Sequence, residues 1–311
     1  MNIKDVLVGH VEDREALTGV SVILFPKGAV ASCDVRGSAP GTREVALLEP
    51  TKMIRKIHGI ALCGGSAFGL RAAEGVVRYL KEKNVGFDTG FGKVPIVPAA
   101  VIFDLGIGRK DVYPDEEMGY KACINAKEGI PQTGSVGVGT GATVGKVLGM
   151  KFASKSGIGF HEENLPHEIK VSALTVVNAF GDVYEDGKII AGARKPVGSG
   201  FLNTEKYIRT LIGTITSKFM ENTTLSVVAT NAEITKEEAK KISEMAHDGM
   251  ARAIRPIHTM FDGDIVFTAG TGEKGKMSVN ILGTVAAICV EKSIINAVKS
   301  VTNPEDSQES S

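Results

Sequence analysis

Short β-forming runs alternate with amphipathic helical runs along this chain of 311 residues, which predicts a protein of mixed α and β structure. Hydrophobic residues make up 43% of the sequence and charged residues 23%, as in a folded globular protein. Neither an internal repeat nor a linker-like stretch divides it. We therefore expect one α+β domain over residues 1–311, with an aliphatic core, because Trp is absent and aromatic residues are only 5%.

The first half of the chain carries strand signals followed by helical ones. Two strands are predicted at residues 20–25 and 28–35, joined by a Pro-Lys-Gly turn. The next elements in chain order are a short helix at 50–58, a strand at 59–65, a helix at 67–83, an extended segment at 94–105 and a short helix at 118–129.

The second half contains the clearest local signals. A capping box from Thr235 to Glu238 predicts a helix that ends near Ala253. β-forming residues from Thr223 predict a strand that starts directly after a long irregular segment at 194–222. The other predicted elements are a strand with a turn at 167–185, a strand at 264–272, a mostly apolar helix at 277–301 and a disordered tail at about 302–311.

Charge and targeting signals narrow the class of protein. Lys plus Arg and Asp plus Glu both number 36, so the net charge is zero and we expect no nucleic-acid partner. The N-terminus lacks the pattern of a signal peptide, and the longest uncharged apolar stretch, 277–290, is too short to span a bilayer. The scattered cysteines indicate reduced, buried thiols. We expect a cytoplasmic protein with no membrane partner.

Three glycine-rich motifs resemble ligand-binding loops but depart from them. GVGTGA at 137–142 fits G-x-G-x-x-A without a clear strand before it. TGATVGK ends in Gly-Lys, yet Thr140 stands where a phosphate-binding loop has its first glycine. GGSAFG, around Ser66, has its last glycine one position too late for a nucleophile elbow. We interpret these glycines as close backbone approaches and predict no cofactor and no metal.

A chain cut before Thr223 would gain an N-terminal nucleophile. A threonine hydroxyl is a weak nucleophile unless a base lies beside it. The new α-amine would have a pKa of about 7.7–8.0 and would lie a few bonds from the hydroxyl. A strand would hold both groups in place. Residue types alone do not predict the cut, because Asn-Thr-Thr is also an ordinary strand start.

Six ordered sequence blocks carry a resemblance to a known family. They are residues 17–44, 60–80, 94–105, 134–146, 222–232 and 245–264. Together they resemble the P1 family of peptidases: the DmpA-type L-aminopeptidase/D-esterases, the β-peptidyl aminopeptidases and the endo-type nylon-oligomer hydrolases. The resemblance implies a four-layer αββα sandwich of the N-terminal-nucleophile type. It also implies a self-processing amidohydrolase that acts on small peptide, amide or ester substrates, and a homo-oligomer of tetramer type.

The resemblance also implies where the chain is cut. Matched position by position, it places the cleavage between Asn222 and Thr223, so that residues 1–222 and 223–311 become separate chains. Thr223 is then the nucleophile. A threonine at this position is similar to the nylon-oligomer branch, whereas the aminopeptidase members carry serine.

Other site residues follow from the same resemblance. Asp262 and Asp264 match an acidic pair, which would orient the α-amine and the supporting Thr224. Asn178 matches an asparagine that borders the nucleophile and would donate a hydrogen bond to the oxyanion. Lys155 matches the family lysine of a KGG-like segment, although a serine replaces the first glycine here.

Two alternatives stay open from the sequence. His258, Asp262 and Asp264 could hold a metal ion in a metal-dependent hydrolase, which a chelator would inhibit. The chain could also be an unprocessed homologue that binds ligands without catalysis. Such a protein would run as one band near 32.8 kDa on a denaturing gel.

Overall fold

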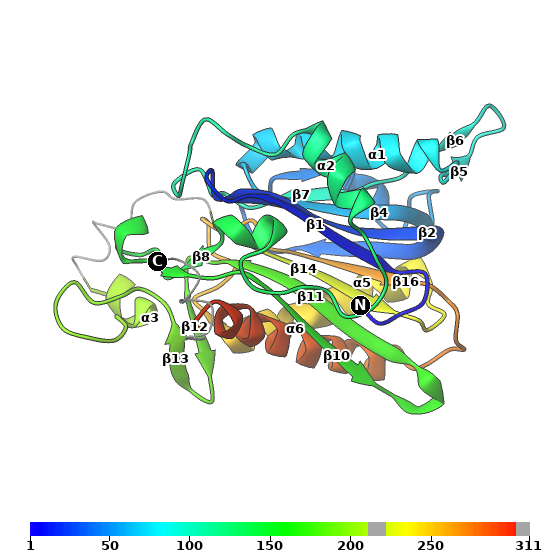
Figure 1. Cartoon of the computed structure of the whole chain (residues 1–311). Coiled ribbons are helices and arrows are strands. Elements are labelled where there is room, and N and C mark those ends of the chain that lie inside the picture. The colour runs from blue at the N-terminus through cyan, green and yellow to red at the C-terminus, as the bar shows by residue number, and fades with distance from the viewer. Residues whose placement is uncertain (211–221, 303–311) are drawn as a thin grey trace.

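The computed structural model describes residues 1–210 and 222–302, and its strands form two layers that lie between helices (Figure 1). The helices are α1 (Ala72–Glu82), α2 (Glu116–Ile124), α3 (Thr204–Ile208), α5 (Lys236–Ala253) and α6 (Val279–Thr302). α1 and α2 cover one outer face of the strands, and α5 and α6 cover the other. This arrangement is the predicted four-layer αββα sandwich.

Within the described residues, nine strands form one continuous sheet path. They are β1 (Leu7–Asp13), β2 (Thr18–Val35), β3 (Thr42–Arg43), β4 (Lys56–Cys63), β7 (Ala99–Val101), β10 (Ile158–Asn164), β11 (Lys170–Asn178), β14 (Thr223–Thr230) and β16 (Ile265–Gly270). Their order is β10, β11, β14, β16, β2, β4, β7, β3, and β1 also pairs with β2. β14 and β16 run parallel, as do β4 and β7, whereas β11 and β14 are antiparallel. The sheet is therefore mixed.

Small additional sheets lie outside this path. β5 (Phe87–Asp88) pairs with β6 (Lys93–Val94), and β8 (Thr143–Val144) pairs with β9 (Ser154–Lys155). A three-stranded sheet joins β13 (Lys188–Ala191), β12 (Asp182–Glu185) and β15 (Ile254–Arg255).

β2 links the two strand layers, and here the predicted pair of separate strands is wrong. Its first half pairs with β1 and β4, and its second half pairs with β16. The register with β4 shifts between Leu24 and Ala29, and Gly28 adopts a φ of 73°. Pro26, Lys27 and Gly28 thus form a bulge in a continuous strand rather than a hairpin turn, because a bulge bends and twists a strand without ending its pairing.

Side chains that alternate between the two faces of the strands form three separate apolar layers. On β2, Ile23 faces the core between the strand layers, whereas Val22 and Leu24 face α1 and α2. On β11, Leu174 lies in the central core, and Ala173 lies under α5 and α6. Successive side chains of a strand point to opposite faces. Both faces are covered here, which explains why these strands are apolar throughout rather than alternating with polar residues.

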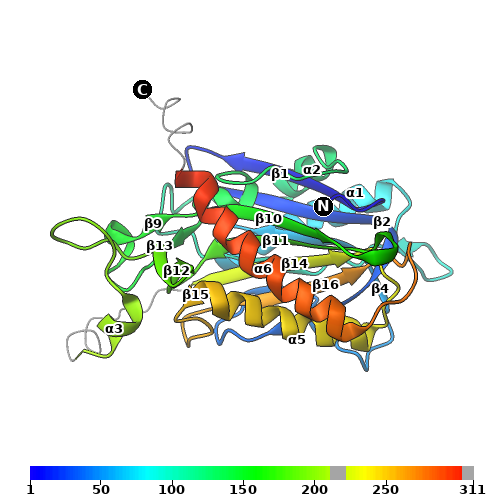
Figure 2. The same cartoon turned by 90° about the horizontal axis from the view of Figure 1, so that it is seen from below.

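The predicted capping box and the two C-terminal helices are present. Thr235 Oγ1 accepts a hydrogen bond from Glu238 N, and Glu238 Oε2 accepts one from Thr235 N, as the pattern predicts for the start of α5. α6 packs on α5, β10 and β11 (Figure 2). At their contact, a Cβ on Gly249 would lie 2.1 Å from Ala287 O, so only glycine allows this close approach.

α6 is also long and apolar enough, by length and composition, to cross a membrane. More than half of its most apolar window is buried inside the protein. The apolar residues of this helix therefore serve the core, as they do in any helix that is packed between other elements.

Other sequence expectations have mixed outcomes. The short helix at 50–58 is wrong: β4 begins at Lys56, because Ile57 pairs with Ala29 of β2 and enters the central core. The irregular segment at 194–222 contains α3, and its residues 211–221 lie outside the described residues, as does the tail at 303–311. The cysteines are free and buried, as predicted: Cys33, Cys63, Cys123 and Cys289.

Candidate active site

The Asn222–Thr223 junction lies at the start of β14, deep in the protein. Asn222 is fully buried and Thr223 is 4% exposed. The Thr223 hydroxyl donates a hydrogen bond to the Asn222 carbonyl oxygen at 2.5 Å, and Gly263 N–H donates to the same oxygen at 2.7 Å. Two donors thus converge on the oxygen of the carbonyl that a cleavage at this bond would attack.

The segment that follows α5 holds this junction in place. Asn222 forms a parallel bridge with Asp262, and its N–H donates to Phe261 O at 2.8 Å. A Cβ on Gly263 would lie 2.6 Å from Ala39 O and 3.0 Å from Thr223 Oγ1. Only glycine at this position lets the backbone N–H come so close to the junction.

Asp264 connects the junction to a histidine. Its Oδ1 accepts a hydrogen bond from Thr224 N at 2.6 Å, and its Oδ2 accepts from His258 N at 3.1 Å and pairs with His258 Nδ1 at 2.8 Å. Asp264 is fully buried. One carboxylate of the predicted acidic pair therefore reaches the threonine pair directly, across 40 residues of sequence.

Asp262 has a different position. Its Oδ2 accepts hydrogen bonds from Thr259 N at 2.9 Å and Thr259 Oγ1 at 2.5 Å, and its Oδ1 accepts from Phe180 N at 3.4 Å. Burial, and to a smaller extent the charge of Asp264, raises the pKa of Asp262 to about 6. This carboxylate closes the turn that presents Gly263 N–H, and none of its hydrogen bonds goes to Thr223 or Thr224.

Asn178 lies directly across from Thr223 in the pairing of β11 with β14. Its Nδ2 donates to Phe103 O at 3.0 Å, and its Oδ1 accepts from Thr143 N at 3.1 Å. Asn178 therefore borders Thr223, as the sequence predicted. In the uncleaved chain one amide N–H of Asn178 donates a hydrogen bond to a backbone carbonyl. The role of Asn178 as oxyanion donor stays a prediction.

Lys146 is the site residue that sequence reasoning missed. Its Nζ donates to Asn178 Oδ1 at 2.7 Å and to Asn178 O at 2.9 Å. Burial lowers the pKa of Lys146 to about 7, against the opposing charges of Asp262 and Asp104. The signal was present in the TGATVGK motif, where a lysine stands among glycines and apolar residues, a composition that buries its amine.

Lys155, by contrast, makes no contact with Asn178 or Thr223. Its Nζ donates to three carbonyls, Ser156 O at 2.5 Å, Gly139 O at 3.0 Å and Ala142 O at 3.1 Å. Burial lowers the pKa of Lys155 to about 8. These bonds brace the glycine-rich turn, so Lys146 rather than Lys155 is the lysine that contacts Asn178.

The residues proposed for the metal alternative do not converge as ligands. Asp264 is bonded to His258 and Thr224, and Asp262 is bonded to Thr259. In residues 1–210 and 222–302, no group of three or more His, Cys, Asp or Glu side chains is placed to hold a metal ion.

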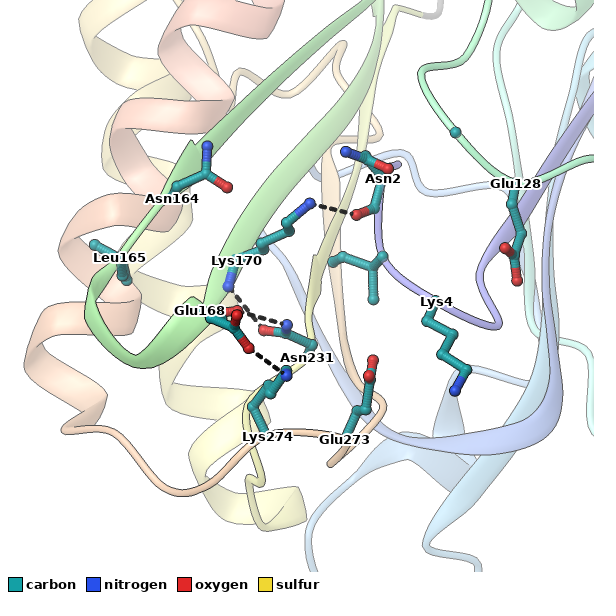
Figure 3. Close-up of a pocket in the computed structure, with 12 residues that line it drawn as sticks. Asn2, Lys4, Glu128, Asn164, Leu165, Glu168, Lys170, Asn231, Glu273 and Lys274 are labelled. Carbon is teal, nitrogen blue, oxygen red and sulfur yellow. Dashed lines mark hydrogen bonds and ion pairs between the residues drawn. The ribbon is translucent and has the colours of Figure 1, made fainter.

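Two cavities lie at opposite ends of the β11–β14 pair. One, of about 610 Å³, reaches Thr143, whose N–H is bonded to Asn178. The other, of about 630 Å³, lies beside Asn231, just after β14 (Figure 3). The first cavity is the one that adjoins the Thr223 end of the strand.

The chain is similar to known proteins over nearly its whole length. The model of peptidase family S58 matches residues 1–309. An uncharacterised aminopeptidase of Mycobacterium tuberculosis is 37% identical over 302 residues, which cover 90% of this chain and 85% of that protein. A 6-aminohexanoate-oligomer endohydrolase of Kocuria sp. is 30% identical over 316 residues, which cover 94% of this chain and 84% of the relative.

Solved structures show the same fold. A Burkholderia sp. β-aminopeptidase matches with a TM-score of 0.68 at 20% identity, covering 96% of this chain and 85% of that one. The L-aminopeptidase D-Ala-esterase/amidase of Ochrobactrum anthropi, described as a variant of the Ntn-hydrolase fold, matches with a TM-score of 0.68 at 17% identity and the same coverage. The family resemblance read from the sequence blocks is confirmed: this chain belongs to peptidase family S58, and it has the fold of the Ntn hydrolases.

Proposed function

We propose that this chain cleaves itself between Asn222 and Thr223, and that Thr223 then hydrolyses amide or ester bonds of small substrates. The observation that carries the proposal is the Thr223 hydroxyl at 2.5 Å from the Asn222 carbonyl oxygen, with Gly263 N–H on the same oxygen. The names of the relatives, aminopeptidases and an oligoamide endohydrolase, support amide substrates.

Self-cleavage would begin with attack of Thr223 Oγ1 on the Asn222 carbonyl carbon. The carbonyl oxygen then carries negative charge, and Gly263 N–H is already bonded to it. A donor placed at such an oxygen stabilises the transition state by roughly 2.7–4 kcal/mol. The C–N bond breaks, the hydroxyl proton passes to the Thr223 nitrogen, and Asn222 becomes an ester on Oγ1. Water hydrolyses this ester and frees the new α-amine.

The processed enzyme would use the same hydroxyl on a substrate. The Thr223 α-amine takes the hydroxyl proton as Oγ1 attacks the substrate carbonyl carbon, and it gives that proton to the departing amine. The acyl group is then an ester on Thr223. Water attacks this ester, the α-amine takes the water proton and returns it to Oγ1, and the carboxylate product leaves.

The surrounding polar groups would hold this arrangement rather than react. Asp264 keeps the Thr224 N–H, and with it the first peptide of β14, in a fixed orientation. Asp262 closes the turn that carries Gly263. Lys146 bonds to Asn178 Oδ1, which turns the amide nitrogen of Asn178 to the other side. Rigid placement of this kind supplies much of the rate in nucleophilic catalysis.

The test is the mass of the purified chain and of two variants. The parent should give fragments of residues 1–222 and 223–311 and hydrolyse small amides. Thr223→Ala should stay one chain without activity, because no nucleophile remains, and Thr223→Ser should still cleave to some extent. Thr230→Ala, a threonine at the other end of the same strand, is the matched control and should cleave normally. Normal cleavage of Thr223→Ala would refute the proposal.

The same samples test the remaining expectations. A metal-dependent hydrolase would lose activity with a chelator, and a non-catalytic binding protein would stay at 32.8 kDa in every sample. We also propose a cytoplasmic homo-oligomer. Light scattering of the processed enzyme would give its subunit number, and a monomer would contradict that part.

A further inference from the structure

Among the described residues, 1–210 and 222–302, those that line the cavity beside Asn178 are basic, apolar or uncharged polar, and none is acidic. Its lining is Gly106, Ile107, Thr143, Met150, Lys151, Ala153, Ser154, Lys155, Ile190, Ala191, Arg194 and Phe201. An adjoining hollow shares Lys151, Arg194 and Phe201 with it, adds Lys195, and also contains no Asp or Glu. Among the described residues, the charged side chains that line these two hollows are therefore all basic.

These cations form no ion pair within the described residues. Arg194 donates through Nη2 to Lys151 O at 2.9 Å, and Lys155 donates to carbonyls. No carboxylate within residues 1–210 and 222–302 forms an ion pair with Lys151, Lys155, Arg194 or Lys195. Elsewhere on the surface, Arg78 pairs with both Glu116 and Glu117. An arginine with donors to spare is well suited to bind a carboxylate.

Apolar side chains also line this cavity. Met150, Ile190 and Phe201 contribute hydrophobic surface. At the inner side, Thr143 lines the cavity and donates its N–H to Asn178, which pairs with Thr223. A molecule in this cavity would therefore have one end near the strand that carries the nucleophile and an apolar stem that leads away from it.

We propose that this cavity binds the carboxylate end of the substrate, so that the enzyme prefers short amides with a free carboxylate on an apolar stem over neutral amides of the same shape. This inference rests on the proposed function, since it names the substrate class of that site. Arg194 and Lys151 are the specificity residues, and the carboxylate can belong to a chain terminus or to a side chain.

Binding measurements test the inference whether or not the chain is processed. The probes are N-acetyl-γ-aminobutyrate and its primary amide, titrated by calorimetry into the purified protein. We expect the carboxylate to bind about tenfold tighter than the amide, as a charge-assisted hydrogen bond would give. Arg194→Gln should remove most of this preference, and Lys151→Gln should reduce it. Arg55→Gln, an exposed arginine that pairs with Glu237 and lines neither hollow, is the matched control and should keep it.

Kinetics on the processed enzyme then identify the source of the carboxylate. The substrates are alanyl-alanine, its C-terminal amide, and alanyl-aspartic acid α-amide. A higher kcat/KM for the first indicates a terminal carboxylate, and a higher value for the third indicates a side-chain carboxylate. Equal affinities for the two binding probes, or a preference that survives both Arg194→Gln and Lys151→Gln, would overturn the inference. Failure of the proposed function shows separately, as an uncleaved chain in the mass measurement.

Discussion

The two ends of β14 carry cavities of nearly equal volume, about 610 and 630 Å³, yet their chemistry differs. At the Asn231 end, Lys274 pairs with Glu168 at 2.6 Å, and Asn231 accepts from Lys170 N and donates to Glu168 O (Figure 3). The lining there contains three lysines and three glutamates: Lys4, Lys170, Lys274, Glu128, Glu168 and Glu273. Its charges balance within the cavity itself.

At the Thr223 end the polar groups are buried and the cavity is basic. Asp262, Asp264 and Lys146 are each at most 3% exposed. Burial of a charged group costs free energy unless the group is bonded, so these groups persist only because each accepts or donates specific hydrogen bonds. The comparison teaches that cavity volume does not identify a functional site. Buried ionisable groups distinguish the Thr223 end as the candidate site.

The largest change should follow from Asn178→Asp. The carboxylate would place an acceptor against Phe103 O and against the charge that develops in the reaction, so kcat should fall about 10²–10³-fold if Asn178 is the oxyanion donor. Asn231→Asp is the matched control, an asparagine at the opposite end of the same strand pair, and should leave kcat near that of the parent. Steady-state hydrolysis measures both. If Asn178→Asp has the kcat of the parent, Asn178 is not the oxyanion donor.

A smaller loss is expected for Asp264→Asn. The amide keeps one acceptor oxygen, so either Thr224 N–H or the His258 donors lose their partner. We expect self-cleavage to slow by about 10- to 100-fold, as for the loss of a charge-assisted hydrogen bond. The time course of the two fragments, followed by mass spectrometry, measures it. Glu168→Gln at the Asn231 end is the control and should cleave at the parent rate. Equal slowing of both variants would contradict a specific role for Asp264 at the Thr223 end.

Lys146→Met should change how stability depends on pH. The native protein binds fewer protons at Lys146 than the unfolded chain does between pH about 7 and 10.5. The contribution of this group to the unfolding free energy therefore rises with pH across that window, by up to about 1.4 kcal/mol per pH unit. Urea unfolding at several pH values should show that the unfolding free energy of Lys146→Met rises less steeply with pH than that of the parent. Lys170→Met is the control for loss of a lysine. Identical slopes for parent and Lys146→Met would contradict the burial effect.

The smallest effect should come from Lys274→Gln. This lysine forms an exposed ion pair with Glu168, and exposed pairs contribute little to stability because water screens them. The unfolding free energy and the rate of self-cleavage should both equal those of the parent within error. A clear loss in either measurement would show that the Asn231 end has a role beyond surface pairing.

Local signals predicted the local structure well. The start of α5 at its capping box depends on residues within one turn, and these two hydrogen bonds form whatever the rest of the chain does. The start of β14 at Thr223 follows from a run of β-branched residues. The proximity of Asp264 to Thr224 came instead from the family resemblance, because no spacing rule joins positions 40 residues apart.

Pairing partners account for the predictions that were wrong. Pro26-Lys27-Gly28 has the composition of a turn, but β4 pairs with β2 both before and after it, and the residues become a bulge. The end of the helix predicted at 50–58 likewise joins a strand, because β4 begins at Lys56 and Ile57 is buried between the strand layers. Tertiary burial overrides weak local preference in both places.

The sequence by itself determined the class of fold and the family, since ordered blocks of residues carry that information, and it predicted cleavage at the Asn222–Thr223 junction. Only the tertiary structure decided which lysine contacts Asn178. Lys146 follows one glycine-containing segment and Lys155 precedes another, and nothing in their spacing shows which of them contacts Asn178. The packing of the β8–β9 region directs Lys146 Nζ to Asn178 and directs Lys155 Nζ to the carbonyls of a turn. The physical reason is that the direction of a buried amine depends on which acceptors surround it, and strands distant in sequence supply them.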